Sequence, residues 1–266
     1  GPLPLAANWD ETSVTNTRNT YEAIFRDCAV DPACAKKHPS LRERFYAFLE
    51  GLTKDPILLT IPLPDGKDST SYTVTGKEVF ALLGDVSSAE IPRVPALLEN
   101  LLAGDLTMLE EVGTGRLQMG TGSGLGMRLS VWCAEELIFA DPARVARERT
   151  RYPEITGAEP TVFRYEVCRA WNVRPELLRE NQPVTSDIPT LLLSGGYDPI
   201  TPPAWAEEMR ATLSNALHLV FPGWTHGVTT YWDNPCGMDV ARAFFNDPSG
   251  PLSTNCLDQL SPVVFE

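Results

Sequence analysis

The sequence has few basic residues, no long hydrophobic run and no short repeat. Its 22 Lys and Arg residues face 35 Asp and Glu residues, which gives a net charge of −13. Nucleic-acid binding and docking on anionic lipid both need a basic face, so both functions are disfavoured. No apolar run approaches the roughly 20 residues of a membrane-spanning helix. With 43% hydrophobic residues over 266 positions, the chain can still bury a sizeable core.

Motifs for metal and phosphate binding are also missing. No CxxC pair and no Cys/His cluster with zinc spacing occurs, so we expect no metal and no cofactor. The glycine-rich run GTGRLQMGTGSGLG at 113–126 resembles a phosphate-binding loop only in its glycines. It holds no GxxxxGK[ST] motif and no helix with a lysine follows it. We interpret 113–126 as a connector or mobile loop.

Six cysteines form an even set, which favours an exported protein with three disulfides, although buried free thiols in a cytosolic protein stay an alternative. Cys28 and Cys34 bracket a short acidic turn, and Cys236 and Cys256 bracket the last Gly/Pro-rich stretch. These placements favour the pairs Cys28–Cys34 and Cys236–Cys256, which leave Cys133 to pair with Cys168, one choice among fifteen connectivities. The chain opens GPLPLAANWDE, without the features of a signal peptide. We therefore expect an extracytoplasmic protein whose leader has been removed, or whose natural beginning is not residue 1.

Hydrophobic periodicity predicts that the first part of the chain is helical. Residues 1–14 are an irregular, proline-rich lead-in. From 15 to 112 apolar residues recur at helical spacing, which predicts a series of short helices. Two β-type runs, 57–62 and 71–74, flank a turn sequence and predict one hairpin.

Residues 127–266 follow a different pattern. Compact apolar runs at 127–133, 188–194 and 217–221 predict buried strands. Strands of this kind that alternate with helices are typical of a parallel sheet covered by helices. The expected helices are 142–151, 161–171, 203–213 and 238–245.

Two of the predicted strands end in segments with catalytic side chains. Asp198 follows the strand at 188–194, and His226 follows the strand at 217–221. Functional groups in open α/β sheets collect at the carboxyl ends of strands. An α/β-hydrolase delivers the acid and base of its Ser–Asp–His triad in this order of strand, Asp loop, helix, strand and His loop. The alternatives are that Asp198 caps the turn or the helix at Pro203 and that His226 is a structural or surface histidine.

Several segments resemble the α/β-hydrolases of the prolyl/tripeptidyl aminopeptidase type with a TAP-like C-terminal domain. This resemblance implies the fold class: α/β, with a helical cap at 15–112 followed by the C-terminal strands and helices of an α/β-hydrolase sheet at 127–266. It also implies that Asp198 is the triad acid and His226 the base. The matching segments are FRDCAVDPAC (25–34), GMRLSVWCAEE (126–136), CRAWNV (168–173), LLLSGGYDPITPP (191–203), HLVFPGWTHGV (218–228) and the tail around Cys236 and Cys256.

The sequence departs from that family at the nucleophile. The family places a serine on a G-x-S-x-G elbow, and neither this elbow nor an HGGG-type oxyanion loop occurs here. We therefore expect part of a serine hydrolase that cleaves peptide N-termini or small amides. Its serine would come from a second chain or from a missing N-terminal half. The alternatives are an esterase on the same scaffold, a non-catalytic fragment or binding module, and Ser123 or Ser194 as a nucleophile beside His226.

Three residues are candidates for substrate binding. Glu135 and Glu136 follow the predicted strand at 127–133, so we expect both carboxylates near the carboxyl edge of the sheet. Carboxylates there would bind the α-ammonium group of a peptide, and the alternative is that they begin a helix. Trp224 is a candidate to line an apolar pocket, for instance for a proline-like side chain, although core packing is the more common role of Trp.

Overall fold

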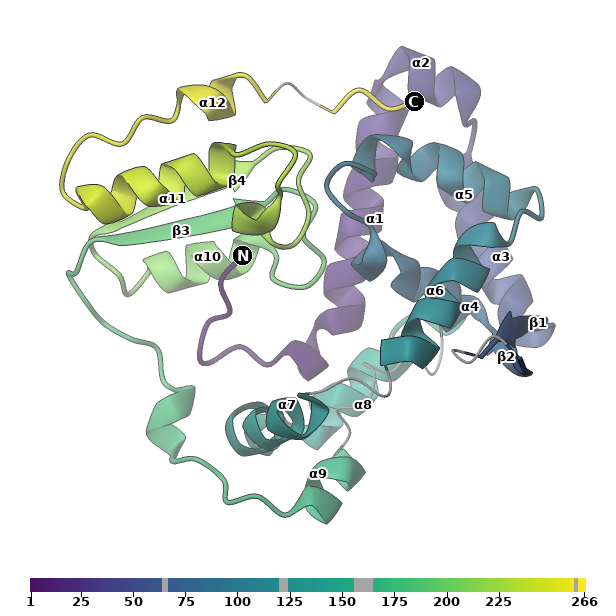
Figure 1. The fold of residues 1–266 in the computed structure, drawn as a ribbon, viewed down its shortest axis with the longest axis horizontal. Coiled ribbons are helices and arrows are strands. Elements are labelled where there is room, and N and C mark those ends of the chain that lie inside the picture. The colour runs from purple at the N-terminus through teal and green to yellow at the C-terminus, as the bar shows by residue number, and fades with distance from the viewer. Residues whose placement is uncertain (64–66, 120–123, 156–164, 261–262) are drawn as a thin grey trace.

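The structure, a computed structural model, describes residues 1–63, 67–119, 124–155, 165–260 and 263–266. Figure 1 shows two layers of organisation and a third, smaller group of helices. A group of helices, α1 to α6, lies on one side, and we call it the helical half. A small parallel sheet with helices on both faces lies on the other side, and a third group of helices, α7 to α9, lies below both.

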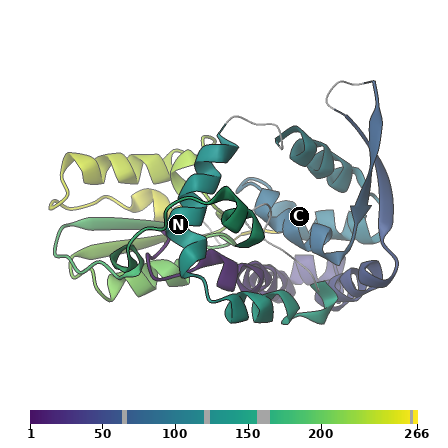
Figure 2. The same ribbon diagram turned by 90° about the horizontal axis from the view of Figure 1, so that it is seen from below.

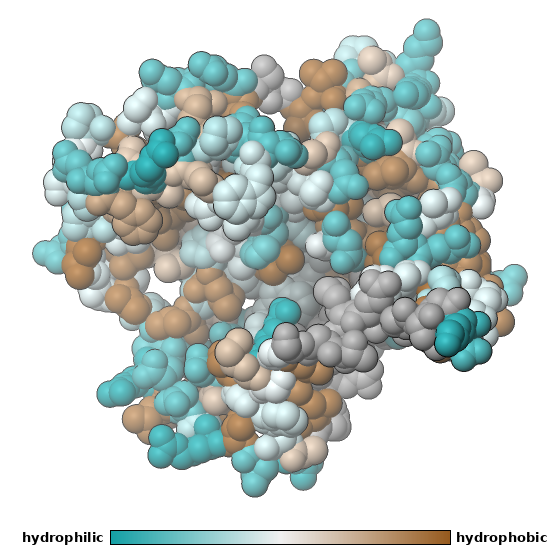
Figure 3. All heavy atoms as spheres, in the orientation of Figure 1, coloured by the Kyte–Doolittle hydropathy of each residue, from teal (hydrophilic) through white to brown (hydrophobic). Residues whose placement is uncertain are grey.

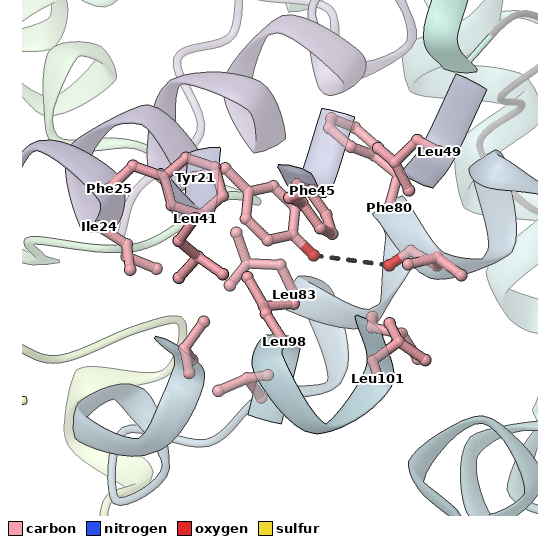
Figure 4. Close-up of a cluster of buried hydrophobic side chains, with 14 of the residues drawn as sticks. Tyr21, Ile24, Phe25, Leu41, Phe45, Leu49, Phe80, Leu83, Leu98 and Leu101 are labelled. Carbon is pink, nitrogen blue, oxygen red and sulfur yellow. Dashed lines mark hydrogen bonds between the residues drawn. The ribbon is translucent and has the colours of Figure 1, made fainter. Parts of the chain in front are cut away.

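The helical half is built around one hydrophobic core, drawn in Figure 4. Apolar residues at helical spacing on α1 (Ser13–Val30) and α3 (Leu41–Lys54) face each other across it. Tyr21 is fully buried there and donates a hydrogen bond from its hydroxyl to the Val79 carbonyl at 3.5 Å. The remaining elements of this half are α2 (Pro32–Lys37), α4 (Gly76–Phe80), η2 (Ala81–Asp85), η3 (Ile91–Arg93), α5 (Val94–Leu102) and α6 (Thr107–Met119), preceded by η1 (Trp9–Glu11).

The predicted hairpin is confirmed. Strands β1 (Ile57–Pro62) and β2 (Ser69–Val74) pair antiparallel, with Ile57 opposite Val74 and Pro62 opposite Ser69. The hairpin projects away from the helices, as Figure 2 shows. Leu59, Ile61 and Val74 point from it into the core of the helical half.

The sheet of the second layer consists of β3 (Thr190–Gly195) and β4 (Ala216–Phe221), which pair in parallel. Both strands were predicted from their apolar runs and are confirmed. Helix α10 (Pro203–Arg210) makes the crossover between them, and α11 (Cys236–Asn246) covers the other face (Figure 1). A parallel pair needs such a crossover, and here it aligns the two strands so that both end at the same edge.

The predicted strand at 127–133 is wrong, because this segment is helical. Helix α7 (Leu125–Val131) runs directly into the π-helical turn η4 (Trp132–Glu136). The buried side chains of this stretch recur every four residues, which is helical spacing. They are Leu129, Cys133 and Leu137.

The glycine-rich connector is shorter than expected, because α6 continues to Met119. Residues 120–123, which include Ser123, lie outside the described residues. The predicted helices at 142–151 and 161–171 correspond to α8 (Pro142–Thr150) and α9 (Tyr165–Trp171). Short helical turns complete the chain: η5 (Leu137–Phe139), η6 (Pro153–Ile155), η7 (Leu178–Asn181), η8 (Val228–Thr230) and α12 (Asn255–Asp258).

All six cysteines are paired in disulfides, and the predicted connectivity is confirmed. Cys28–Cys34 joins α1 to α2, and Cys133–Cys168 joins η4 to α9. Cys236–Cys256 joins α11 to α12. Each group of helices thus contains one covalent link.

The segment 263–266 returns from the sheet to the helical half, as the yellow trace in Figure 1 shows. Phe265 is buried in the core of that half. The backbone N–H of Glu266 donates to the Pro92 carbonyl at 3.0 Å, and the Glu266 carbonyl lies 3.2 Å from His38 Nε2. This segment therefore fastens the two layers together.

Candidate functional site

The ends of β3 and β4 bring Asp198 and His226 into direct contact. His226 Nδ1 lies 3.0 Å from Asp198 Oδ2 and 3.2 Å from Oδ1. Two backbone hydrogen bonds hold the loops together: Gly196 N–H donates to the Phe221 carbonyl at 2.9 Å, and Tyr197 N–H donates to the Trp224 carbonyl at 2.8 Å. The side chains predicted as acid and base are thus hydrogen-bonded to each other.

Gly195 makes this close approach of the loops possible. A Cβ atom at this position would lie 2.2 Å from the Thr225 carbonyl oxygen and 2.5 Å from that of Trp224. Neither oxygen can move freely because both belong to the backbone. The glycine at the end of β3 is therefore required for the His226 loop to pack against the strand.

Asp198 is held as a carboxylate. It is almost completely buried, and its oxygens accept hydrogen bonds from the backbone N–H groups of Ile200 and Thr201, the Thr201 hydroxyl and the amino group of Gly1. Burial alone would raise the pKa of Asp198. The hydrogen bonds that its oxygens accept, first among them the one with His226, outweigh burial and hold the pKa well below its usual range.

The ionised carboxylate determines the tautomer of His226. A carboxylate only accepts hydrogen bonds, so His226 Nδ1 must carry the proton and, in the neutral ring, Nε2 is the free base. The side chain of His226 is 43% exposed. Among the described residues, no hydrogen-bond partner faces Nε2. This nitrogen is available to take a proton from a group that arrives from outside.

Thr201 is a member of the site that the sequence analysis missed. Its hydroxyl donates to Asp198 Oδ2 at 2.8 Å, and its Oγ1 lies 3.1 Å from His226 Nδ1. One side chain therefore touches both the acid and the base. The available signal was a threonine three residues after an aspartate at a turn, a spacing at which hydroxyl and carboxylate groups often bond within the turn.

Ser194 belongs to a separate hydrogen-bond chain. Its Oγ lies 3.0 Å from His218 Nε2, and His218 Nδ1 lies 2.6 Å from Glu207 Oε1. These contacts resemble a Ser–His–Glu triad, but Ser194 is fully buried and a substrate cannot reach its hydroxyl. The chain of hydrogen bonds joins β3, β4 and α10, so we assign it to the stability of the sheet. Ser194 thus contacts His218, where a nucleophile would need to face His226.

Glu135 and Glu136 do not lie beyond a strand, because η4 is helical; the expected position at the sheet edge is wrong. Burial, together with the negative charges of Asp10 and Glu135, raises the pKa of Glu136 to about 7. Asp10, which sequence reasoning missed, is buried and accepts a hydrogen bond from Trp132 Nε1 at 3.2 Å. Burial likewise raises the pKa of Asp10 to about 6. Glu136 and Asp10 therefore form a pair of carboxyl groups that are partly protonated near neutral pH.

Trp224 lies in a hydrophobic cluster beside the sheet, where its ring centroid is 4.8 Å from that of Phe221 and 4.8 Å from that of Tyr231. Its side chain is 5% exposed, which favours core packing over contact with a substrate. Its carbonyl, however, accepts the hydrogen bond from Tyr197 N–H. Trp224 thus supports the site through its backbone.

Neither a membrane span nor a metal centre was found in the described part of the chain. Its helices are too short or too polar to cross a bilayer. In the same residues, no three His, Cys, Asp or Glu side chains are grouped so as to hold a metal ion.

Comparison with known proteins supports the hydrolase resemblance for the second half of the chain. Residues 158–256 match the model of a family described as TAP-like protein. The matched region contains β3, α10 and β4, and with them Asp198 and His226. Comparisons with the curated proteins and with the solved structures gave no match. The C-terminal region that carries Asp198 and His226 is therefore a TAP-like domain of the α/β-hydrolase kind.

Proposed function

We propose that this chain supplies the acid and the base of a serine hydrolase of the aminopeptidase type. His226 Nε2 takes the proton of a serine hydroxyl and then passes it to the leaving amine. Asp198 holds the ring in the required tautomer and stabilises the imidazolium that forms. The observation that carries this proposal is the contact of 3.0 Å between a buried, ionised Asp198 and the Nδ1 of a half-exposed His226.

The nucleophilic serine, in this proposal, comes from a polypeptide segment outside the 266 residues. Two observations support this. No hydroxyl of the described residues faces His226 Nε2, and Ser194 is already bonded to His218. Hydrophobic side chains also reach the surface along the chain that leads from α9 to β3 (Figure 3), as exposed apolar patches do at interaction sites. The exposed residues there are Leu177, Leu178, Val184 and Ile188.

The helical half would act as the cap of the hydrolase, and the protein would work outside the cytoplasm. The three disulfides support the location, because such bonds persist in oxidising compartments.

Peptide substrates of an aminopeptidase carry an α-ammonium group. Glu136 is a candidate to bind it: with a pKa of about 7, the carboxyl group would lose its remaining proton when a cation approaches.

The test is a mass measurement of the natively purified protein before and after reaction with a fluorophosphonate probe. We expect a co-purifying polypeptide to take the label. Label on the 266-residue chain itself would overturn the external origin of the serine. No label on any polypeptide would overturn the hydrolase proposal.

Two histidine variants test whether His226, rather than His218, is the base. His226→Ala removes the proposed base, so labelling of the complex should fall at least about a hundredfold, the lower range for general-base catalysis. His218→Gln is the matched control, because His218 also contacts a serine and a glutamate. Loss of labelling in His218→Gln but not in His226→Ala would show that the Ser194 chain is the reactive one. Hydrolysis of a peptide amide rather than a matched ester then separates aminopeptidase from esterase.

A further inference from the structure

Each loop that carries a proposed catalytic side chain is bound by one hydrogen bond to the helical half. The Tyr197 hydroxyl donates to Asp27 Oδ2 on α1 at 2.6 Å. The backbone N–H of Thr225 donates to Ser88 Oγ, between η2 and η3, at 3.0 Å. Tyr197 directly precedes Asp198, and Thr225 directly precedes His226.

We propose that Tyr197 and Ser88 are positioning residues, through which the helical half sets the geometry between the Asp198 carboxylate and the His226 ring. This inference rests on the proposed function, in which these two groups are the acid and base. A catalytic constellation needs its groups held to about 0.5 Å, which exposed loops rarely achieve without support from a second layer. Here the helical half provides that support.

Tyr197 is well suited to this role because it connects three parts of the molecule. Its ring is buried in the core of the helical half, its hydroxyl bonds to α1, and its backbone N–H bonds to the Trp224 carbonyl in the His226 loop. A shift of α1 would therefore move both loops together. The helical half is fixed to the site at this point and is not a freely hinged lid there.

The Tyr197–Asp27 contact is a hydrogen bond from a phenol to a carboxylate oxygen. Burial and the Asp27 carboxylate raise the pKa of Tyr197, so the phenol stays protonated and remains a donor. The second oxygen of Asp27 accepts from Arg26 Nε at 2.9 Å, which orients the carboxylate. Hydrogen bonds to an ionised acceptor are about twice as strong as neutral ones.

Proton NMR of the 266-residue chain tests the proposal without any need for activity. The Nδ1 proton of His226, bonded to a carboxylate, gives a downfield resonance that is slow to exchange with water. We expect this resonance to move upfield or broaden in Tyr197→Phe and Ser88→Ala, because each removes one loop contact. Tyr21→Phe is the matched control: it removes a tyrosine hydroxyl from the same core, at a site away from both loops.

Two variants of Asp27 test the same contact at its acceptor. Asp27→Asn keeps an oxygen that accepts from Tyr197 and should retain the resonance, whereas Asp27→Ala should lose it. An unchanged resonance in Tyr197→Phe and Ser88→Ala would overturn the positioning role. Absence of the resonance in the parent protein would instead overturn the Asp198–His226 pair, so the two failures are distinguishable. In the completed hydrolase we expect kcat to fall about tenfold with KM unchanged, less than the roughly hundredfold cost of a 1 Å misplacement.

Discussion

Asp10 gives the sharpest prediction on stability, because its buried carboxyl group is poorly solvated. One oxygen accepts a hydrogen bond from Trp132 Nε1, and the other is buried with no hydrogen-bond partner among the described residues. Burial raises its pKa from 3.8 to about 6, although the hydrogen bond from Trp132 and the nearby charge of Arg149 oppose this. We predict that Asp10→Asn stabilises the protein at pH 8. The amide oxygen can still accept from Trp132, and no charge is buried.

The magnitude follows from proton linkage. Between pH 4 and pH 6 the folded protein holds a proton at Asp10 that the unfolded chain has lost, so stability falls as pH rises through this window. A rise from 3.8 to about 6, at about 1.4 kcal/mol for each pH unit, costs about 3 kcal/mol above pH 6. Asn lacks this cost at every pH. The gain in unfolding free energy should therefore approach about 3 kcal/mol at pH 8 and vanish near pH 4.

Thermal unfolding followed by circular dichroism is the assay. For a chain of this size, about 3 kcal/mol corresponds to a rise in Tm of roughly 6–12 °C. Asp187→Asn, a change of an exposed carboxylate, serves as the control and should leave Tm unchanged at both pH values. An equal gain at pH 8 and pH 4, or a loss at pH 8, would refute the reasoning that burial of the charge destabilises the fold.

Three further predictions concern the site and the disulfides. Thr201→Val removes a hydrogen bond to the ionised Asp198, so the unfolding free energy measured in urea should fall by about 1.5–3 kcal/mol; an unchanged midpoint would contradict the bond. Gly195→Ala places a methyl group 2.2 Å from the Thr225 carbonyl and should abolish the downfield histidine resonance, whereas Gly84→Ala, with open space around it, should preserve it. Reduction of the three disulfides should lower Tm by well over 10 °C, since each removed bond typically costs 2–5 kcal/mol; a drop of only a few degrees would show that they contribute little.

The parts of the fold that could be predicted are those fixed by local pattern. Apolar runs that end in turn residues predicted β3 and β4, and the placement of cysteines along the chain predicted the three disulfides. The strand prediction for residues 127–133 failed because a short apolar run occurs equally in buried strands and buried helices. Only the spacing of Leu129, Cys133 and Leu137, four residues apart, distinguishes the helix, and Leu137 lies outside the run.

For the candidate site, the order of strands and loops along the chain was informative. Contacts between residues that are far apart in the sequence could not be predicted. The order of strands and loops predicted that Asp198 and His226 would meet, which the hydrogen bond between them confirms, while their catalytic role stays a prediction. Asp10 could not be predicted, because its partner Trp132 is 122 positions away and its raised pKa comes mainly from burial in the fold. Glu136 was misplaced since its expected position depended on a strand that is a helix.

The return of residues 263–266 to the helical half has a consequence for synthesis of the chain. Nearly all of the helical core comes from residues before 156, yet Phe265 is part of it. The contact between His38 and Glu266 spans 228 positions, and contacts between such distant residues slow folding. During translation the helices emerge well before Phe265, so their core stays open until residue 265 has been made. The final packing of the helical half therefore depends on a segment that lies beyond the sheet in the sequence.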